Sequence, residues 1–173
     1  MQIRDSHPIV DAVLDRHRRE IGDSLPVYRN HVLRCLNYQQ LLLGEAVPDS
    51  AALAWAVHDL GIWTVGSWDY LDASADLVGR HAAEFGIDDI EAARRMVLEH
   101  HRLRGVDDRL AETFRIADRI DVTHGLLHRP VTRAEVKAVV AQLPYVGFHA
   151  FLARQAARYA LTHPTRPMPM VRW

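Results

Sequence analysis

The chain has 173 residues, of which 49% are hydrophobic, and its 21 basic side chains nearly balance its 22 acidic ones. This balance provides no basic excess for a nucleic-acid partner, and no apolar run reaches the roughly 18 residues that a membrane-spanning helix needs. We therefore expect one globular domain over residues 1–173. The N-terminal stretch MQIRDSHPIV has no apolar signal region, and Cys35 has no second cysteine with which to pair, so we expect a cytoplasmic protein.

Helical patterns follow one another along almost the whole chain. Alternation of apolar and polar residues, which would indicate strands, is not sustained anywhere. The sequence therefore predicts an all-α bundle of about eight helices. The expected helices cover residues 8–21, 25–43, 50–61, 72–85, 88–103, 108–124, 132–142 and 146–162.

Capping residues and glycines indicate where these helices begin and end. Thr132 and Glu135 form a capping-box pattern, and Asp49 and Asp88 precede two other helices. Glycine falls where five helices are expected to stop, at Gly44, Gly61, Gly86, Gly105 and Gly125. The tail over 163–173 contains three prolines, and we expect it to leave the last helix in an extended conformation.

The segment Ala54–Trp63, AWAVHDLGIW, places a histidine and an aspartate in a helix that is otherwise apolar on every side. A helix of this kind is buried, and a buried carboxylate needs a cation or several hydrogen-bond donors. A metal ion bound jointly by His58 and Asp59 would satisfy both side chains. The alternative is structural: His58 donates a hydrogen bond to a backbone carbonyl, and Asp59 caps a neighbouring helix.

Three other predicted helices also direct a polar side chain into an apolar face. His31 lies in a core-facing stripe, and Asp118 shares a face with Phe114. His100 and His101 continue the apolar face of the helix before them. Each alone is more often a hydrogen-bonded core residue, but together the four helices indicate a metal site in the bundle core. Two histidines and two carboxylates suit Fe, Mn, Ni, Co or Zn better than Ca.

The order His … His-Asp … Asp in an all-helical chain resembles the HD-domain superfamily of metal-dependent phosphohydrolases. The matching residues are His31 in YRNHVLRC, His58 and Asp59 in AVHDLGIW, and Asp118 in FRIADRIDV. The resemblance covers residues 25–125, which is most of the chain. It implies an HD-like bundle in which these four residues are the primary ligands of a divalent transition metal.

The histidine doublet in EHHRLRG is similar to the extra histidine segment of HD members that hold two metals. The resemblance therefore implies that His100 or His101 helps to bind a second ion or the substrate. Members with two metals also supply a histidine between the HD pair and this doublet, and His81 is the candidate here.

The residues after the HD pair depart from the pattern of the phosphohydrolases. Many members continue the motif as His-Asp-Ile-Gly-Lys, with the lysine close to the substrate phosphate. This chain has Ile62 and Trp63 after Gly61, so that cation is missing. The superfamily also includes diiron oxygenases and hydratases such as cyanamide hydratase, which keep the same ligands, and these are alternatives to phosphate chemistry.

An HD-type site implies that metal-bound water attacks a small-molecule substrate. Asp59 would bridge two ions or accept the proton of this water. Arg34, Arg102 and Arg104 are the candidates for supplying positive charge to a phosphate. The alternative is that they are surface arginines paired with acidic residues such as Glu99.

The longest predicted loop, over residues 61–71, is rich in aromatic residues. Trp63, Trp68 and Tyr70 form an apolar wall against the substrate, or else they anchor the loop in the core. Asp69 is a candidate acid or base, and an N-cap in the alternative interpretation.

Two polar residues near the end of the helix over 108–124 are candidates for orienting the metal ligands. These are Asp121 and His124. In the alternative interpretation they are ordinary polar groups at a helix end.

Three functions follow from these observations. The first is a metal-dependent hydrolase of a small phosphate ester or nucleotide. The second is a metal enzyme of non-phosphate chemistry, either a hydratase or an oxygenase. The third is a non-catalytic helical module whose polar core is structural. A homo-oligomer is compatible with each of them.

Overall fold

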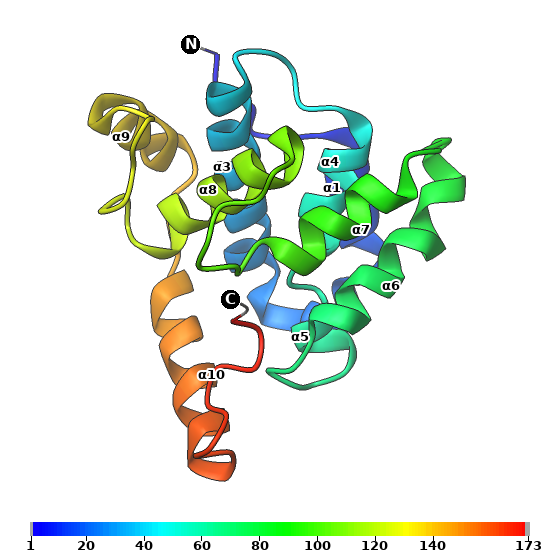
Figure 1. The fold of residues 1–173 in the computed structure, drawn as a ribbon, viewed down its shortest axis with the longest axis vertical. Coiled ribbons are helices and arrows are strands. Elements are labelled where there is room, and N and C mark those ends of the chain that lie inside the picture. The colour runs from blue at the N-terminus through cyan, green and yellow to red at the C-terminus, as the bar shows by residue number, and fades with distance from the viewer. Residues whose placement is uncertain (1, 172–173) are drawn as a thin grey trace.

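The computed structural model describes residues 2–171, and these residues form helices and no strands (Figure 1). The prediction of an all-α fold is therefore confirmed for this part of the chain. Eight of its helices have nine residues or more. They are α1 (Pro8–Arg16), α3 (Leu25–Leu43), α4 (Asp49–Val57), α6 (Leu71–Ala82), α7 (Ile90–Glu99), α8 (Arg109–Val122), α9 (Arg133–Gln142) and α10 (Phe148–Thr162). The short helices α2 (Arg18–Ile21) and α5 (Gly61–Thr64) and two 3₁₀ turns, Gly22–Ser24 and Ala83–Phe85, connect them.

Helix α4 forms the centre of the hydrophobic core. It packs against α1, α6 and α7, while α3 packs along α8. Every residue from Ala51 to Val57 is fully buried, as its apolar sequence predicts. Trp55 stacks face to face on Phe114 of α8, with ring centroids 3.5 Å apart. This stacking joins the centre of the core to the helix that carries Asp118.

The predicted helix over 50–61 ends earlier than expected, and its last residues form a tight turn. The amide of Leu60 donates to the carbonyl of Val57, and α5 then begins at Gly61. Gly61 is therefore not a helix stop. Its amide donates to Ser74 Oγ at 2.9 Å, and a Cβ atom at this position would lie 2.6 Å from the carbonyl oxygen of Tyr70. Glycine is required here because α5 and α6 approach each other closely.

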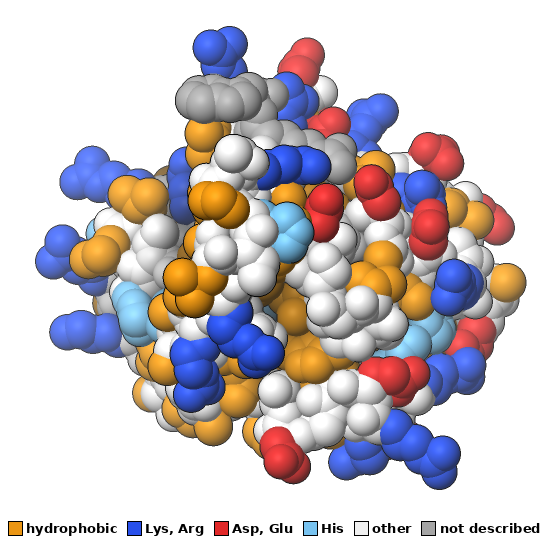
Figure 2. Space-filling view, turned by 90° about the horizontal axis from the view of Figure 1, so that it is seen from below, with side chains coloured by type: hydrophobic (Ala, Val, Ile, Leu, Met, Phe, Trp, Pro, Cys, Tyr) orange, Lys and Arg blue, Asp and Glu red, His pale blue; other side chains and the backbone are white. Residues whose placement is uncertain are grey.

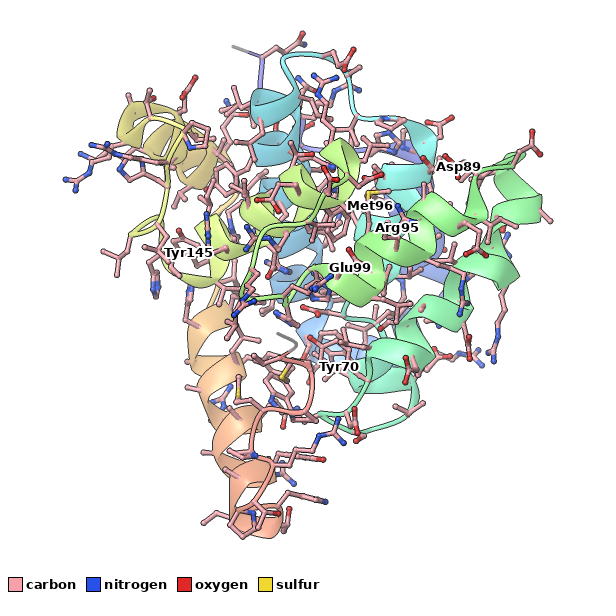
Figure 3. The ribbon with its side chains drawn as sticks, viewed as in Figure 1. Tyr70, Asp89, Arg95, Met96, Glu99 and Tyr145 are labelled. Atoms are coloured by element: carbon pink, nitrogen blue, oxygen red, sulfur yellow. The ribbon has the colours of Figure 1, made fainter. Side chains whose placement is uncertain are left out.

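Other helix ends also differ from the sequence prediction. The helix over 8–21 divides at His17 into α1 and α2, and α4 has Pro48 rather than an acidic side chain at its N-cap. Helix α7 runs from Ile90 to Glu99 and not over 88–103, and its N-cap is Asp89 rather than the expected Asp88 (Figure 3). The capping box of α9 is confirmed. None of the helices in residues 2–171 is both long enough and apolar enough to cross a bilayer.

Helix α10 projects from the body, and the tail folds back beside it (Figure 1). For the described part of the tail, residues 163–171, the prediction of an extended conformation is wrong, because Met170 is buried with Trp68 and Tyr70 in a second apolar cluster; residues 172–173 lie outside the described chain. An ion pair between Arg166 and Asp69, 3.6 Å apart, also links the tail to the loop before α6. Figure 2 views this end of the molecule and shows apolar side chains in the middle of the face with charged side chains around its edge.

Candidate metal centre

The five residues predicted as metal ligands lie together in the core. His31 comes from α3, His58 and Asp59 from the turn after α4, His100 from the residue that follows α7, and Asp118 from α8. None of the five is more than 5% exposed. The helices bring them together because each ligand interrupts an apolar face that packs into the same core.

The donor atoms of these residues are spaced as ligands of one ion. His31 Nε2 lies 3.0 Å from His58 Nε2, 3.6 Å from Asp59 Oδ2 and 3.5 Å from Asp118 Oδ1. His58 Nε2 lies 3.3 Å from Asp59 Oδ2 and 4.0 Å from Asp118 Oδ1. Donors that each bind one ion at about 2.0–2.2 Å are separated by about 3–4 Å. His31, His58 and Asp118 therefore have the spacing that a divalent ion requires, and Asp59 Oδ2 lies at a similar distance from both histidines.

Hydrogen bonds fix the tautomer of three of the histidines. His31 donates through Nδ1 to Asp121 at 2.8 Å, and His58 donates through Nδ1 to the carbonyl of Trp55 at 2.9 Å. His100 donates in the same way to the carbonyl of Val97 at 2.7 Å. A neutral imidazole that donates from Nδ1 carries a lone pair on Nε2.

The Nε2 lone pairs of His31, His58 and His100 and the two carboxylates therefore form two overlapping groups of three, His31–His58–Asp118 and His58–Asp59–His100. His31 and His58 cannot hydrogen-bond through their facing Nε2 atoms, because neither atom carries a hydrogen. His100 Nε2 lies 3.5 Å from Asp59 Oδ1 and has no hydrogen-bond partner among residues 2–171. Buried acceptors without donors are costly, and a cation removes this cost. The residues present fit a divalent metal ion.

Ionisation of the two carboxylates depends on this environment. Burial alone would raise the pKa of Asp59, but the positive charge of His58 and His100 in their protonated forms brings the pKa well below its usual range. Burial raises the pKa of Asp118 to about 8, and the nearby negative charge of Asp59 adds to this effect. Burial also lowers the pKa of His31 to about 4, so its ring stays neutral and keeps its lone pair at neutral pH.

Asp121 orients His31, as the sequence suggested, and Arg34 completes the arrangement. Arg34 is fully buried, and it donates from Nε and Nη2 to the two carboxylate oxygens of Asp121 at 2.6 and 2.8 Å. Its Nη1 donates to the carbonyls of Leu143 and Pro144. Burial alone would raise the pKa of Asp121, but hydrogen bonds from Arg34 and His31 lower it.

Arg34 therefore does not have the place that the sequence predicted for it. It is not a surface arginine, because it is fully buried, and it does not line the cavity beside the metal centre. Its guanidinium instead binds Asp121 and two backbone carbonyls. Its contacts assign it a positioning role behind His31.

Tyr70 holds Asp59 by the carboxylate oxygen that also faces His100. Its hydroxyl donates to Asp59 Oδ1 at 2.6 Å and lies 2.9 Å from His101 Nε2. Because the phenol has one hydrogen, which Asp59 accepts, His101 donates to Tyr70 from Nε2. The Nδ1 lone pair of His101 then faces Asp118 Oδ2 at 3.8 Å. His101 therefore lies at the edge of the site. It carries its hydrogen on Nε2, whereas the other three histidines carry theirs on Nδ1.

Other predicted site residues lie elsewhere. Asp69 is exposed on the surface, and the N-cap of α6 is Tyr70, so the N-cap interpretation of Asp69 is wrong. Trp63 packs against Tyr28 and Phe151, with ring centroids 4.8 and 5.3 Å away, and does not line the cavity beside the metal centre.

The remaining candidates lie outside the ligand cluster. Arg104 is exposed in the loop after α7, which ends at Glu99 and not at residue 103 as predicted. Arg102 lies 3.9 Å from Glu99, the pairing that the alternative interpretation predicted. His81 faces His17, with their Nε2 atoms 3.1 Å apart, and belongs to none of the metal-ligand clusters in the described chain.

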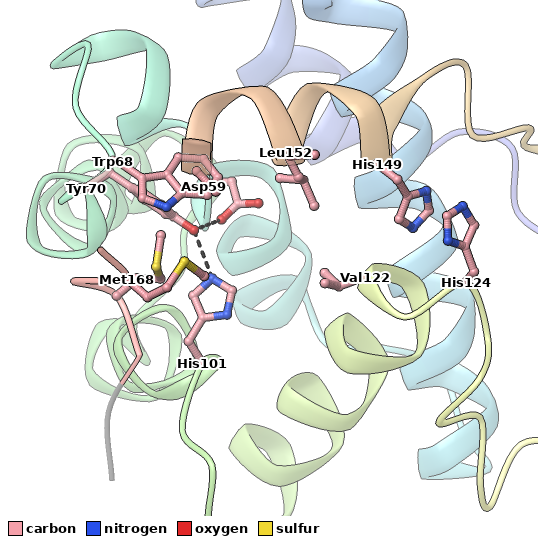
Figure 4. Close-up of a pocket in the computed structure, with 12 residues that line it drawn as sticks. Asp59, Trp68, Tyr70, His101, Val122, His124, His149, Leu152 and Met168 are labelled. Atoms are coloured by element: carbon pink, nitrogen blue, oxygen red, sulfur yellow. Dashed lines mark hydrogen bonds between the residues drawn. The ribbon is translucent and has the colours of Figure 1, made fainter. Parts of the chain in front are cut away.

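A cavity of about 350 Å³ lies beside Asp59 (Figure 4). Trp68 and Tyr70 form part of its wall, as one of the two interpretations of the loop predicted. His124 lines it too and does not orient a metal ligand through a hydrogen bond in the described structure. His149 was missed, because a single histidine on the amphipathic helix α10 gives no signal in the sequence. Its ring stacks on that of His124.

No protein-family model matches this chain, and neither a curated protein nor a solved structure matches it. The resemblance to the HD superfamily therefore depends on the order of the motif residues and on their helical setting.

Proposed function

We propose that this chain is a metal-dependent hydrolase with an HD-type site. The observation that carries the proposal is the convergence of the His31 and His58 lone pairs with the carboxylates of Asp59 and Asp118. This donor set suits Fe, Mn, Ni, Co or Zn. A divalent ion bound there would polarise the substrate and lower the pKa of a bound water, supplying hydroxide at neutral pH.

The surrounding residues support this chemistry by fixing the ligands. Asp121 holds the His31 ring by its Nδ1 hydrogen, and Tyr70 holds Asp59 by one of its two oxygens. Orientation by such outer hydrogen bonds is typical of metal-ligating histidines and carboxylates. His101 donates to Tyr70, which donates to Asp59, so this chain of hydrogen bonds leads protons from the cavity toward Asp59.

Two kinds of reaction are compatible with the proposed metal site. Phosphate esters and nucleotides are the substrates that the resemblance implies. A hydratase or oxygenase is the second candidate, and one observation favours it. Ile62 is buried and Trp63 packs between aromatic rings, so the segment after Gly61 brings no cation to the site.

Metal analysis tests the proposal directly. Purified protein is expected to hold at least one equivalent of transition metal, and His58→Ala is expected to lose both the metal and all turnover. His163→Ala is the matched control, because His163 is exposed at the end of α10. Wild-type protein that binds none of the five metals, and whose melting temperature does not respond to them, would contradict the proposal and support a non-catalytic module. Oxygen consumption by iron-loaded protein would select the oxygenase.

A further inference from the structure

The cavity beside Asp59 has a predominantly apolar lining. Its volume of about 350 Å³ is at the low end of the range of about 300–1,000 Å³ that is typical of small-molecule sites. No lysine or arginine is among the described residues that line it. Most of the wall consists of the side chains of Trp68, Val122, Leu152, Ala156, Met168 and Met170.

The polar groups of the cavity lie at two separated places. Asp59, Tyr70 and His101 meet at one end, next to the metal centre, while His124 and His149 lie at the other with apolar wall between (Figure 4). His149 donates from Nε2 to the carbonyl of Asp121 at 2.8 Å, which leaves its Nδ1 as a hydrogen-bond acceptor. Burial lowers the pKa of His149, so its ring is neutral at pH 7.

A phosphorylated substrate does not match this lining. A phosphate monoester carries a charge of about −1.5 to −2 at pH 7. Such a group is normally bound by arginine, lysine or a row of backbone amides. Here the groups nearest the metal centre are a carboxylate, a phenol and a histidine, and Tyr70 already donates its hydrogen to Asp59. The body of a nucleotide would bring further charge and polar groups against an apolar wall.

We propose that the cavity binds an uncharged ester or amide with a small apolar body, whose reactive polar end lies beside Asp59, Tyr70 and His101. This inference rests on the proposed hydrolase, because it names the substrate of the same metal centre. The flexible thioether side chains of Met168 and Met170 form part of the cavity wall. Such side chains adapt to substrates whose apolar parts differ in shape. The substrate class is therefore defined by charge and size more than by a single shape.

Binding to the metal-loaded protein tests the inference with four probes. Acetamide, butyramide and benzamide are neutral and increase in apolar size, and phenyl phosphate carries the ring of benzamide with a charged group. Affinities are measured by calorimetry. We expect the affinity to rise along the amide series by about fourfold for each added methylene. Benzamide is expected to bind at least tenfold more tightly than phenyl phosphate.

Two alanines on α10 provide a matched pair of variants. Ala156 lines the cavity, whereas Ala157 is the next residue along the helix, is exposed and does not line it. Ala156→Phe is expected to weaken benzamide binding at least tenfold, and Ala157→Phe is expected to leave it unchanged. Leu152→Trp also fills the cavity from α10 and is expected to weaken benzamide binding in the same way. It replaces Ala156→Phe in the test if that variant does not fold.

The outcomes separate this inference from the proposed function. Metal content is measured first, and protein that binds no metal contradicts the proposed hydrolase. The amide series still tests the apolar cavity in that metal-free protein. Tighter binding of phenyl phosphate than of benzamide overturns the inference while leaving the hydrolase in place. No detectable binding of any amide at its solubility limit also overturns it, as does unchanged benzamide binding in both folded cavity variants.

Discussion

The hydroxyl of Tyr70 donates its hydrogen to Asp59 at 2.6 Å, although Asp59 lies in the turn after α4 and Tyr70 is the N-cap of α6. Gly61 makes this contact possible, because it lets the start of α6 approach the turn that carries Asp59. The position of one metal-centre carboxylate thus depends on a glycine and a tyrosine that bind no metal themselves. The two residues lead to separate predictions.

Tyr70→Phe is expected to keep the metal and lose activity. The variant removes the donor to Asp59 Oδ1 and the acceptor for His101, while the ring still fills its place in the wall. Loss of a hydrogen bond to a charged group costs about 1.5–3 kcal/mol, so we expect turnover to fall at least about tenfold. Elemental analysis of the metal content, together with a measurement of kcat, checks this prediction. Tyr159→Phe, on α10 away from Asp59, is the control, and equal activity of the two variants would contradict the assignment.

Gly61→Ala is expected to destabilise the protein by about 1–3 kcal/mol, because its Cβ would clash with backbone that has little freedom to move. The added atom would lie 2.6 Å from the Tyr70 carbonyl oxygen and 2.8 Å from Ser74 Oγ. Gly79→Ala is the matched control, because no atom lies within 4 Å of the added Cβ. Within helix α6 that change should stabilise by about 0.5–1 kcal/mol. Urea unfolding measures the free energy of unfolding of both variants, which we expect to change in opposite directions. A Gly61→Ala variant as stable as the wild type would contradict the close approach of α5 and α6.

The buried pair of Arg34 and Asp121 predicts a large effect on stability. Arg34→Ala is expected to cost about 3–5 kcal/mol, because it leaves a buried carboxylate without its main partner. Arg34→Lys should restore little of this, since an ammonium group cannot make the two parallel hydrogen bonds. Arg18→Ala is the control: Arg18 also pairs with an aspartate at 2.9 Å, but on the surface, where such a pair is worth about 0–1 kcal/mol. Equal unfolding free energies of the two alanine variants would contradict this account.

His58→Leu is expected to lower stability in the metal-loaded protein but not in the metal-free protein. Without metal, the variant removes one of two lone pairs that face each other at 3.0 Å, so stability should be equal or higher. With metal, the wild type gains about 2.7 kcal/mol at a free ion concentration 100 times the Kd, and the variant loses this gain. Thermal unfolding with and without chelator measures both. A variant less stable than the wild type in chelator would show that His58 is held by other contacts.

Some of these features could be predicted from the sequence because they depend on local pattern. Helix α3 occupies the predicted residues 25–43, since its apolar stripe is continuous and Gly44 ends it in a left-handed conformation. His31 and Asp118 could be predicted as core-facing because each interrupts an apolar face. Their burial, at 0% and 3% exposure, follows from helix periodicity alone.

The partners of these ligands could not be predicted, because they come from distant parts of the chain. Arg34 bonds to a carboxylate 87 residues away, and an arginine one turn after His31 is just as typical of a surface. The sequence placed Tyr70 in an aromatic loop, which indicated an apolar wall. Its hydrogen bond to Asp59 could not be predicted, because it depends on the approach of α5 to α6. Periodicity shows which face a residue occupies, whereas contacts between helices depend on packing.

Acidification is expected to destabilise the metal-free protein partly through His81. His81 is buried, and this burial, together with the charges of His17, Arg16 and Arg80, lowers its pKa, with Glu84 opposing the effect. In the unfolded chain this histidine titrates near its ordinary value of about 6.5. Below that pH the unfolded chain binds a proton that the folded chain does not, so stability is complete above pH 6.5 and falls as the pH drops.

Urea unfolding between pH 7.5 and pH 5.5 measures this effect. His81→Asn is expected to reduce the dependence of unfolding free energy on pH by up to about 1.4 kcal/mol per pH unit, the limit for one proton. Some dependence should remain, because burial also lowers the pKa values of His7 and His31. His163→Asn removes an exposed histidine and is expected to leave the dependence unchanged. If His81→Asn and the wild type show equal slopes, the folded protein accepts a proton at His81 as readily as the unfolded chain does.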